Sequence, residues 1–341
     1  MVALVIGKIT GVFNEIQYKG KVSDHFDGKK FFNNVKYNHD LPAFAFLKWR
    51  FNRTAGNWPK HVALKEHPVP LSNVSEAQLR VTLVGHATFL IQTGGYNILT
   101  DPVWSERVGF YEFGPRRVIE PAIKFSDLPK IDIVLISHNH YDHLDIPTLK
   151  KLNTKFSPFI ITPLGVANSV IKKALGHCNC YEMDWWQKEA FTEDFKIGFV
   201  PAYHWSKRKL FDTNASLWGG YVIESKAGNT YFAGDTGIAN GEIFKEIKEY
   251  YKDIKLALLP IGAYLPSWFM ARNHISPKEA IEIFKMLDAD YAAAMHYNTF
   301  ELADDSYNQA LHELQAELHL KAISPNKFIT LEFGKAWDVE K

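Results

Sequence analysis

Ser137-His138-Asn139-His140-Tyr141-Asp142-His143-Leu144-Asp145 places three histidines and two carboxylates within eight consecutive residues, 138–145. Neutral imidazole and carboxylate oxygen are ligands that suit borderline divalent ions such as zinc. Burying so many polar groups without an ion would cost roughly 2–7 kcal/mol for each unpaired group. A histidine-rich exposed loop or a helix-capping cluster is the alternative interpretation, but the segment predicts a metal site.

The flanking residues place this segment between a strand and a helix. The apolar run 131–137 is typical of a strand that is buried on both faces. Asp145-Ile146-Pro147 predicts a helix start, with Asp145 as N-cap and proline in the first turn. In α/β proteins, functional groups gather where strands end. The segment therefore lies where a site is expected.

The spacing within the segment indicates two ions. His138 and His140 alternate, so both are expected to project to one side of an extended chain. Asp142 and His143 fall on a tightening turn and are expected to face a second ion. Three further candidates follow or end predicted strands and complete the ligand set for two metals: His204, Asp235 and His296.

Working outward, the chain alternates strands and helices. Val81–Gln92, a Gly94-Gly95 turn and Tyr96–Thr100 predict a hairpin that ends at Asp101. The second half repeats this weakly, because Gly228 precedes Asp235 by the interval that separates Gly94 from Asp101. The other predicted strands are 157–162, 195–201, 216–224, 231–234, 255–260, 291–295 and 327–333. Two sheets packed face to face and covered by helices are expected, and duplication remains an open reading of the repeat.

Residues 1–80 lack a strong hydrophobic period and carry aromatic and basic clusters, so they predict an irregular extension packed on a core that comprises residues 81–341. The short apolar run Val2–Ile6 has two readings, a trimmed signal or anchor segment and an ordinary strand or helix start. No run of 18 apolar residues occurs, so no complete transmembrane helix is encoded. A cytoplasmic or membrane-associated protein is expected.

Composition narrows the function classes. The 341 residues include 39 Lys+Arg and 38 Asp+Glu, a formal net charge of +1, which argues against nucleic acid as the partner. A hydrophobic content of 46% supports a large globular core. The two cysteines, Cys178 and Cys180, are separated by one residue and lack the second pair of a zinc ribbon. They are interpreted as small buried thiols.

The motif set resembles a known superfamily. The pattern His-x-His-x-Asp-His, followed by strand-ending His, Asp and His, resembles the metallo-β-lactamase superfamily. Over residues 25–335 the chain resembles its N-acyl-phosphatidylethanolamine-hydrolysing phospholipase D family. The stretches that carry this likeness include Gly85-His86-Ala87-Thr88, Leu99-Thr100-Asp101-Pro102-Val103-Trp104-Ser105, Ala233-Gly234-Asp235-Thr236-Gly237 and Gly262-Ala263-Tyr264. The resemblance implies an α/β fold, an αβ/βα sandwich of two mixed β-sheets flanked by helices, with a dinuclear site at one edge.

The resemblance also implies roles for individual residues. The implied ligands of two divalent ions, taken as Zn²⁺, are His138, His140 and His204 for one ion, Asp142, His143 and His296 for the other, and Asp235 as the bridge. His274 matches a family histidine near the substrate phosphate and precedes a predicted helix start, where anions are favoured. The implied catalytic residues are thus Asp142, Asp235 and His274.

Some positions depart from the family pattern. Leu265 and Ser267 stand where the family has glutamate and arginine, Tyr203 replaces glutamine, Ser206 replaces cysteine, and Tyr297-Asn298 replaces a Trp-Gly pair. None of these positions supplies an implied ligand. The metal chemistry is therefore retained, whereas the headgroup preference is open.

These features together predict a metal-dependent phosphodiesterase of phospholipase D type that cleaves N-acyl-phosphatidylethanolamine-like lipids. Trp205, Tyr264, Trp268 and Phe269 are expected to form an apolar wall for acyl chains, or else to pack as ordinary core. Expected partners are a phospholipid or other small phosphodiester, a peripheral membrane contact and a second copy in a homodimer. Two alternatives are a metal-dependent lactonase similar to ascorbate-phosphate lactonases and an iron-bearing oxidoreductase.

Overall fold

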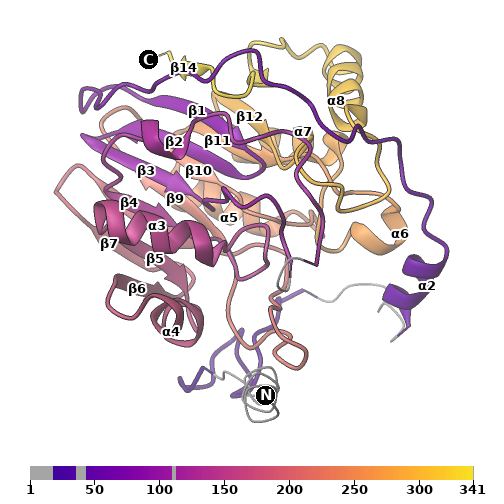
Figure 1. Ribbon diagram of the computed structural model, residues 1–341, viewed down its shortest axis with the longest axis horizontal. Coiled ribbons are helices and arrows are strands. Elements are labelled where there is room, and N and C mark those ends of the chain that lie inside the picture. Colours follow the sequence, from indigo (N-terminus) through magenta and orange to yellow (C-terminus); the bar gives the residue numbers. More distant parts are fainter. Residues whose placement is uncertain (1–17, 36–43, 110–112, 341) are drawn as a thin grey trace.

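A computed structural model describes residues 18–35, 44–109 and 113–340 of the chain. The apolar run Val2–Ile6 lies outside these residues. Two seven-stranded sheets pack against each other and helices cover their outer faces (Figure 1), which confirms the expected αβ/βα sandwich. Among the described residues, none of the helices is both long and apolar enough to cross a membrane.

The first sheet has the order β14-β1-β2-β3-β4-β5-β6. Its strands are β1 (Arg80–Gly85), β2 (Thr88–Thr93), β3 (Tyr96–Thr100), β4 (Ile133–Leu135), β5 (Phe159–Pro163), β6 (Asn179–Met183) and β14 (Ala336–Asp338). The pairings from β14 to β3 are antiparallel and those from β3 to β6 are parallel.

The second sheet has the order β13-β12-β11-β10-β9-β8-β7. Its strands are β7 (Lys188–Ala190), β8 (Lys196–Val200), β9 (Gly220–Glu224), β10 (Asn229–Phe232), β11 (Ile254–Pro260), β12 (Tyr291–Met295) and β13 (Phe328–Ile329). Pairings from β7 to β10 are antiparallel and those from β10 to β13 are parallel. The two sheets thus share one pairing pattern, so that β3 and β10 occupy equivalent places.

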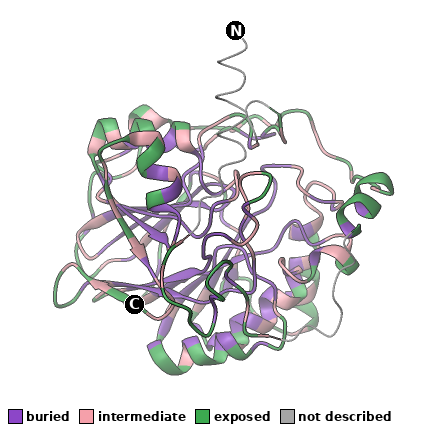
Figure 2. Ribbon diagram, turned by 90° about the horizontal axis from the view of Figure 1, so that it is seen from below, coloured by how far each residue is buried: buried purple, intermediate pink, exposed green. Residues whose placement is uncertain are grey.

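The described helices are α2 (Ala45–Phe51), α3 (Ile146–Phe156), α4 (Lys172–Leu175), α5 (Glu242–Tyr251), α6 (Ser267–Met270), α7 (Pro277–Leu287) and α8 (Gln309–Leu320), with a 3₁₀ turn η1 (Phe125–Asp127) and a π turn η2 (Ala167–Ile171). A capping box of Ser276 and Glu279 starts α7. The strands form the buried centre of the molecule and the helices carry its exposed surface (Figure 2).

Burial on both faces explains why β2 lacks an alternating pattern. Phe89 and Ile91 face the core between the sheets, whereas Leu90 faces a second apolar cluster that contains Leu149 and Leu152 of α3. A strand covered on both sides has no solvent face, so nearly every position is apolar or hydrogen-bonded.

The predicted strand 81–92 is wrong in one respect, because the chain turns at His86. Gly85 and His86 have φ values of 152° and 57°, a conformation that interrupts a strand. Two antiparallel strands, β1 and β2, result in place of one. The turn lies at the edge where the candidate metal ligands gather.

The interpretation of the cysteines as buried thiols is also wrong. Cys178 and Cys180 form a disulfide, and both are half-buried. Their Cα atoms lie 5.6 Å apart, within the range that a disulfide spans. The backbone N–H of Cys180 donates to the carbonyl oxygen of Cys178 (3.0 Å), a tight three-residue turn that brings the two sulfurs together where β6 begins.

The described part of residues 18–79 crosses the surface with little regular structure. Phe26 and Phe31 are buried in the main core. Asn33 donates from Nδ2 to the carbonyl oxygen of His204 (2.9 Å) and accepts from Nε1 of Trp218 (3.1 Å). The early part of the chain therefore lies directly behind one candidate ligand.

Candidate metal centre

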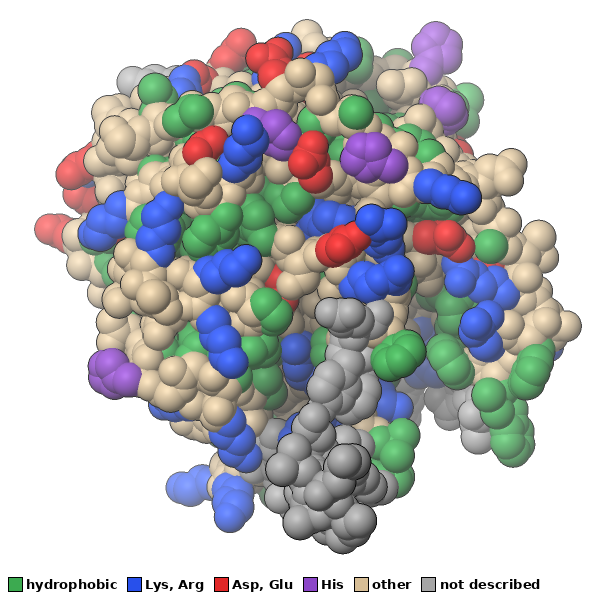
Figure 3. Space-filling view, viewed as in Figure 1, with side chains coloured by type: hydrophobic (Ala, Val, Ile, Leu, Met, Phe, Trp, Pro, Cys, Tyr) green, Lys and Arg blue, Asp and Glu red, His purple; other side chains and the backbone are tan. Residues whose placement is uncertain are grey.

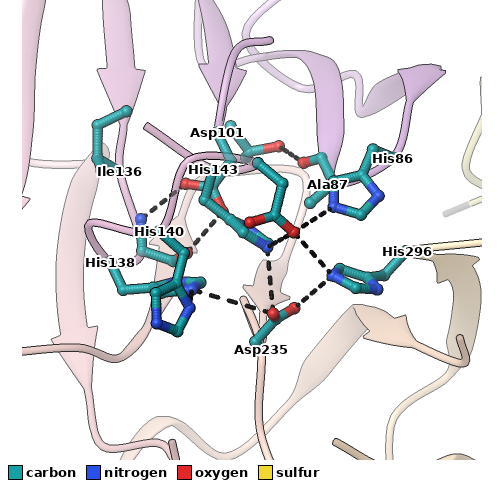
Figure 4. Close-up of polar contacts among 12 residues, drawn as sticks. His86, Ala87, Asp101, Ile136, His138, His140, His143, Asp235 and His296 are labelled. Carbon is teal, nitrogen blue, oxygen red and sulfur yellow. Dashed lines mark hydrogen bonds and ion pairs between the residues drawn. The ribbon is translucent and has the colours of Figure 1, made fainter. Parts of the chain in front are cut away.

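The candidate ligands come from loops that follow strands of both sheets. His138, His140, Asp142 and His143 lie between β4 and α3, His204 follows β8, Asp235 follows β10 and His296 follows β12. The structure brings all seven together at one edge of the sandwich. Figure 4 labels His138, His140, His143, Asp235 and His296 at this edge. The pairing pattern explains this for the second sheet. Both β8 and β10 are antiparallel to β9, and β10 to β12 are parallel, so β8, β10 and β12 run in one direction and end at the same edge.

One group of three histidines converges on a common point. Nε2 of His138 lies 2.8 Å from Nδ1 of His140, and Nε2 of His204 lies 3.3 Å from that same atom. With Zn–N distances of 2.0–2.1 Å, two nitrogens on a tetrahedral ion are separated by about 3.3 Å. The group therefore has the spacing of a ligand set.

A second group forms around Asp142. Its Oδ2 atom lies 3.4 Å from Nε2 of His143 and 3.6 Å from Nε2 of His296. Nε2 of His86 is closer still, at 3.0 Å. These four side chains present ligand atoms within 4.8 Å of one another.

Asp235 lies between the two groups. Its Oδ2 is 3.1 Å from Nε2 of His143, 4.0 Å from Nε2 of His138 and 3.8 Å from Nε2 of His204, and its Oδ1 is 3.2 Å from Nε2 of His296. The carboxylate thus contacts members of both sets. Its side chain is 2% exposed, so water does not compete for these contacts.

The outer hydrogen bonds fix the tautomers of two histidines. Nδ1 of His204 donates to the carbonyl oxygen of Asn273 (2.9 Å). The hydroxyl of Ser137 donates to Asp101 (2.6 Å), so it accepts from Nδ1 of His138 (2.9 Å). A neutral imidazole carries one N–H, so Nε2 of both rings presents a lone pair to the centre. Lone pairs that face one another in this way fit a cation between them.

Burial keeps this first group neutral. It lowers the pKa of His138 and of His204 well below the ordinary value, and the pKa of His140 to about 4. Neutral imidazole is the form that binds a metal ion.

The second group is ionised despite its burial. Burial opposes the charged forms of Asp142 and Asp235, but His143 and other histidines outweigh it and hold the pKa of each carboxyl well below its ordinary value. Burial likewise opposes protonation of His143 and His296, yet the carboxylates raise the pKa of His143 well above the ordinary value and that of His296 to about 9. Carboxylates that stabilise protonated histidines so strongly form a site whose negative charge a divalent cation can neutralise.

The donor set therefore fits metal ions. Oδ1 of Asp235 and Nε2 of His143 and His296 are buried atoms that make ion-pair contacts but no well-aligned hydrogen bond among the described residues. Such atoms are costly unless an ion or water satisfies them. Imidazole nitrogens with carboxylate oxygens suit zinc and related divalent ions.

Sequence reasoning assigned no role to two residues of this site, His86 and Asp101. Asp101 is fully buried and accepts from Nδ1 of His143 (2.6 Å) and from the backbone N–H of Ser137 (2.7 Å). The sequence signal for Asp101 was its spacing, because Asp101 follows Gly94 by the same interval by which Asp235 follows Gly228. No comparable signal marked His86, apart from its place in the stretch Gly85-His86-Ala87-Thr88.

His274 lies at the edge of the centre. Its Nδ1 atom is 3.9 Å from Oδ2 of Asp235 and has no hydrogen-bond partner in the described structure. Burial lowers the pKa of His274 to about 4, so the ring is neutral. A neutral ring with a free inward nitrogen is available either to an ion or to a substrate.

The predicted aromatic wall is divided in the structure. The Trp205 ring contacts that of His140, with centroids 4.7 Å apart, and Tyr264 is buried. Phe269 instead stacks on Trp49 of α2 (5.2 Å), and Trp268 is 47% exposed. Only part of the wall therefore borders the ligands.

Asp145 takes the predicted N-cap position of α3, but its side chain makes no capping bond to that helix. Its carboxylate instead accepts from the backbone N–H of Ser105 (3.0 Å), the hydroxyl of Ser105 (2.8 Å) and the hydroxyl of Thr148 (2.5 Å). Asp145 thus fixes the loop that follows β3.

Comparison with known proteins agrees with the fold and the site. Residues 96–297 match the family described as Beta-lactamase superfamily domain. The chain belongs to the metallo-β-lactamase superfamily and is a metal-dependent hydrolase, whose fold implies divalent metal ions.

Within this superfamily, the chain is 34% identical over 299 residues to N-acyl-phosphatidylethanolamine-hydrolyzing phospholipase D 1 of Caenorhabditis elegans, covering 83% of each chain. It is 36% identical over 239 residues to the mitochondrial N-acyl-phosphatidylethanolamine-hydrolyzing phospholipase D of Saccharomyces cerevisiae, covering 69% of this chain and 50% of that protein. It belongs to the N-acyl-phosphatidylethanolamine-hydrolysing phospholipase D-like family.

Solved structures support the same fold. An isothiocyanate hydrolase from Delia radicum gut bacteria is similar with a TM-score of 0.59 and 19% identity, covering 76% of this chain and 98% of that one. Igni18, a metallo hydrolase of Ignicoccus hospitalis, is similar with a TM-score of 0.56 and 21% identity, covering 77% of this chain and 99% of that one.

Proposed function

We propose that this chain is a phosphodiesterase of phospholipase D type that holds two divalent ions, Zn²⁺, and cleaves N-acyl-phosphatidylethanolamine-like lipids. The observation that carries the proposal is the position of Asp235 between two converging ligand groups. The names of the two phospholipase D relatives support the substrate class.

The seven ligands divide between the ions as the two groups suggest. One ion would be held by His138, His140 and His204, the other by Asp142, His143 and His296, and Asp235 would be shared between them. Two ions so placed would supply charge stabilisation at the phosphoryl oxygens and an acidified water with a pKa near about 7. Addition of water at phosphorus and cleavage of its bond to the headgroup oxygen release a phosphatidic-acid-like product and the headgroup alcohol.

His274 acts on the substrate in this proposal. Its ring is neutral, and Nδ1 faces the space beside Asp235. Nδ1–H donates a hydrogen bond to a phosphoryl oxygen, whose negative charge grows as water adds. Leu265 and Ser267 lack the charges that the family pattern places there, so the headgroup is selected by weaker contacts.

A lipid substrate also needs a surface at which the protein meets the membrane. Helices α2 and α6 carry a group of exposed apolar side chains, which we call the α2–α6 patch and which supports such a contact. Its members are Phe44 (72% exposed), Phe46 (57%), Leu47 (48%), Phe51 (85%) and Trp268 (47%). Isolated exposed apolar residues are common, but a contiguous group marks an interaction surface. Apolar and basic side chains gather there at the lower right of Figure 3.

Charge and position favour a membrane as the partner of this patch. Nζ of Lys48 lies 5.2 Å from the Trp268 ring centroid, and Arg50 is exposed on the same helix. Basic side chains beside aromatic ones suit the interface of a phospholipid bilayer. The backbone N–H of His274 donates to the carbonyl oxygen of Met270 in α6 (3.0 Å), which joins the patch to the site.

The domain organisation follows the same proposal. We propose that residues 81–341 are the hydrolase domain and residues 1–80, of which 18–35 and 44–80 are described, an extension packed on it. The hydrogen bond from Asn33 to the backbone of His204 and the ion pair of Arg53 with Glu301 (2.8 Å) support this division.

The test is a comparison of hydrolysis rates with metal analysis of the purified protein. The substrates are a long-chain N-acyl phosphatidylethanolamine, a water-soluble phosphodiester and a lactone. Preference for the lipid is expected, with two zinc ions per chain. Turnover of the lactone with the lipid untouched would reject the proposal in favour of a lactonase, and bound iron without hydrolysis would favour an oxidoreductase.

A further inference from the structure

His86 lies at the turn between β1 and β2. It contacts two members of the second ligand group, Asp142 from the first sheet and His296 from the second. Its side chain is 2% exposed, and its ring centroid lies 4.0 Å from that of His296. Figure 4 shows His86 beside His296, facing the centre. The proposed ligand set does not use it.

The side chain of His86 contacts the first-sheet half of that group. Its Nε2 lies 3.0 Å from Oδ2 of Asp142, in the loop after β4. An ionised carboxylate only accepts hydrogen bonds, so Nε2 of His86 carries the hydrogen. A nitrogen that donates this bond has no lone pair left for a metal ion.

The backbone of His86 contacts the second-sheet half. Its carbonyl oxygen accepts from the N–H of His296 (2.9 Å), and its N–H donates to Oγ1 of Thr299 (2.9 Å). His86 and His296 both have positive φ, at 57° and 60°. Such conformations persist in non-glycine residues when their surroundings hold them, as these two hydrogen bonds do.

We propose that His86 is a positioning residue that aligns Asp142 of the first sheet with His296 of the second, so that both reach one metal ion. This inference rests on the dinuclear site proposed above. Asp142 and His296 belong to different sheets, so a shift between the sheets would change the distance between them. His86 connects the two sheets at this point with one side-chain and two backbone hydrogen bonds. Partners of this kind typically change metal affinity by about 10–100-fold.

The experiment compares full-length native protein with three variants. His86→Phe keeps a ring of similar shape and removes the donor, whereas His86→Gln places an amide N–H at similar reach. His312→Phe makes the same change at an exposed position of α8. Each protein is stripped of metal and titrated with Zn²⁺ against a chromophoric chelator, and the Co²⁺-loaded forms are compared by absorption.

The native protein and the His312→Phe variant are expected to bind two Zn²⁺. The His86→Phe variant should still bind two Zn²⁺, with one of them about 10–100-fold weaker. The Co²⁺ spectrum of His86→Phe should show an unchanged number of ligands. The His86→Gln variant should recover most of the lost affinity.

Three results would overturn the inference. The first is a native affinity for both ions in His86→Phe. The second is an equal weakening of both ions in His86→Phe and in His86→Gln. The third is the loss of one nitrogen ligand from the Co²⁺ spectrum of His86→Phe, which would make His86 a metal ligand. A native protein that fails to bind two Zn²⁺ would instead reject the dinuclear site itself.

Discussion

The carboxylate of Asp101 accepts a 2.6 Å hydrogen bond from Nδ1 of His143, so the imidazole lies between two aspartates. On its other side, Nε2 of His143 is 3.1 Å from Asp235. Asp101 follows β3 and Asp235 follows β10, which are equivalent strands of the two sheets. The repeated architecture thus supplies one acidic residue to the centre and one behind it.

Replacement of Asp101 by asparagine should loosen His143. The amide removes the charge and one acceptor, so Nδ1–H of His143 and the donors of Ser137 compete for a single oxygen. We expect one Zn²⁺ to bind about 10–100-fold more weakly and the free energy of unfolding to fall by about 1–3 kcal/mol. Zinc titration and urea denaturation measure these effects, with the exposed Asp253→Asn as control. Native zinc affinity in Asp101→Asn would contradict this role.

Asp235→Asn should weaken both ions, because the proposed bridge loses its charge. Asp142→Asn should weaken only one, since Asp142 contacts members of the second group alone. Elemental analysis after dialysis gives the metal content of each variant. Two ions at native occupancy in Asp235→Asn would refute the bridging assignment.

His274→Ala should retain both ions and lose phosphodiesterase rate. Removal of one hydrogen-bond donor from a developing oxyanion typically lowers kcat by about 10²–10³-fold. Steady-state kinetics and metal analysis of the same preparation measure the two effects. Loss of an ion would instead identify His274 as a ligand, a role its 3.9 Å distance to Asp235 permits.

Charge placed in the α2–α6 patch should reduce membrane binding. Phe46→Glu and Phe51→Glu introduce carboxylates that cannot enter the lipid interface without a large desolvation cost. Co-sedimentation with phospholipid vesicles should fall, while turnover of a water-soluble phosphodiester stays at the native rate. Leu320→Glu, at a 77% exposed position of α8, is the matched control. Equal vesicle binding by all variants would place the membrane contact elsewhere.

The attachment of the early chain segment should depend on pH through His25. Nδ1 and Nε2 of this buried ring lie 2.6 Å from Asp24 and 2.7 Å from Asp184. Burial opposes protonation, but the two carboxylates outweigh it and raise the pKa of His25 above its ordinary value. The stabilisation is therefore complete below the unfolded pKa of about 6.5 and is lost as the pH rises through the folded pKa.

His25→Gln measures this contribution. The difference in free energy of unfolding between native and variant protein should be largest below the unfolded pKa of about 6.5. It should shrink as the pH rises through the folded pKa, because the native ring then loses its charge. Denaturant titrations at several pH values give the difference. A difference that grows with pH would show that the ring is neutral in the folded protein.

The sequence by itself determined the type of fold and the ligand chemistry. Apolar runs of strand length, such as 255–260 and 291–295, mark buried strands because the hydrophobic effect acts on local composition. The segment from His138 to His143 is local as well, so its residue types alone predicted a metal site. Asp235 and His296 were predicted as ligands because each ends a strand that its apolar residues identify in the sequence.

Only the tertiary structure decided which distant groups meet. His86 and Asp101 reach the centre because two sheets bring their strand ends to one edge, and the turn at His86 depends on hydrogen bonds to His296 and Thr299, more than 200 residues away. The disulfide of Cys178 and Cys180 likewise depends on the tight backbone turn where β6 begins. Propensity is a property of neighbours in sequence, whereas these contacts are set by packing and long-range hydrogen bonds.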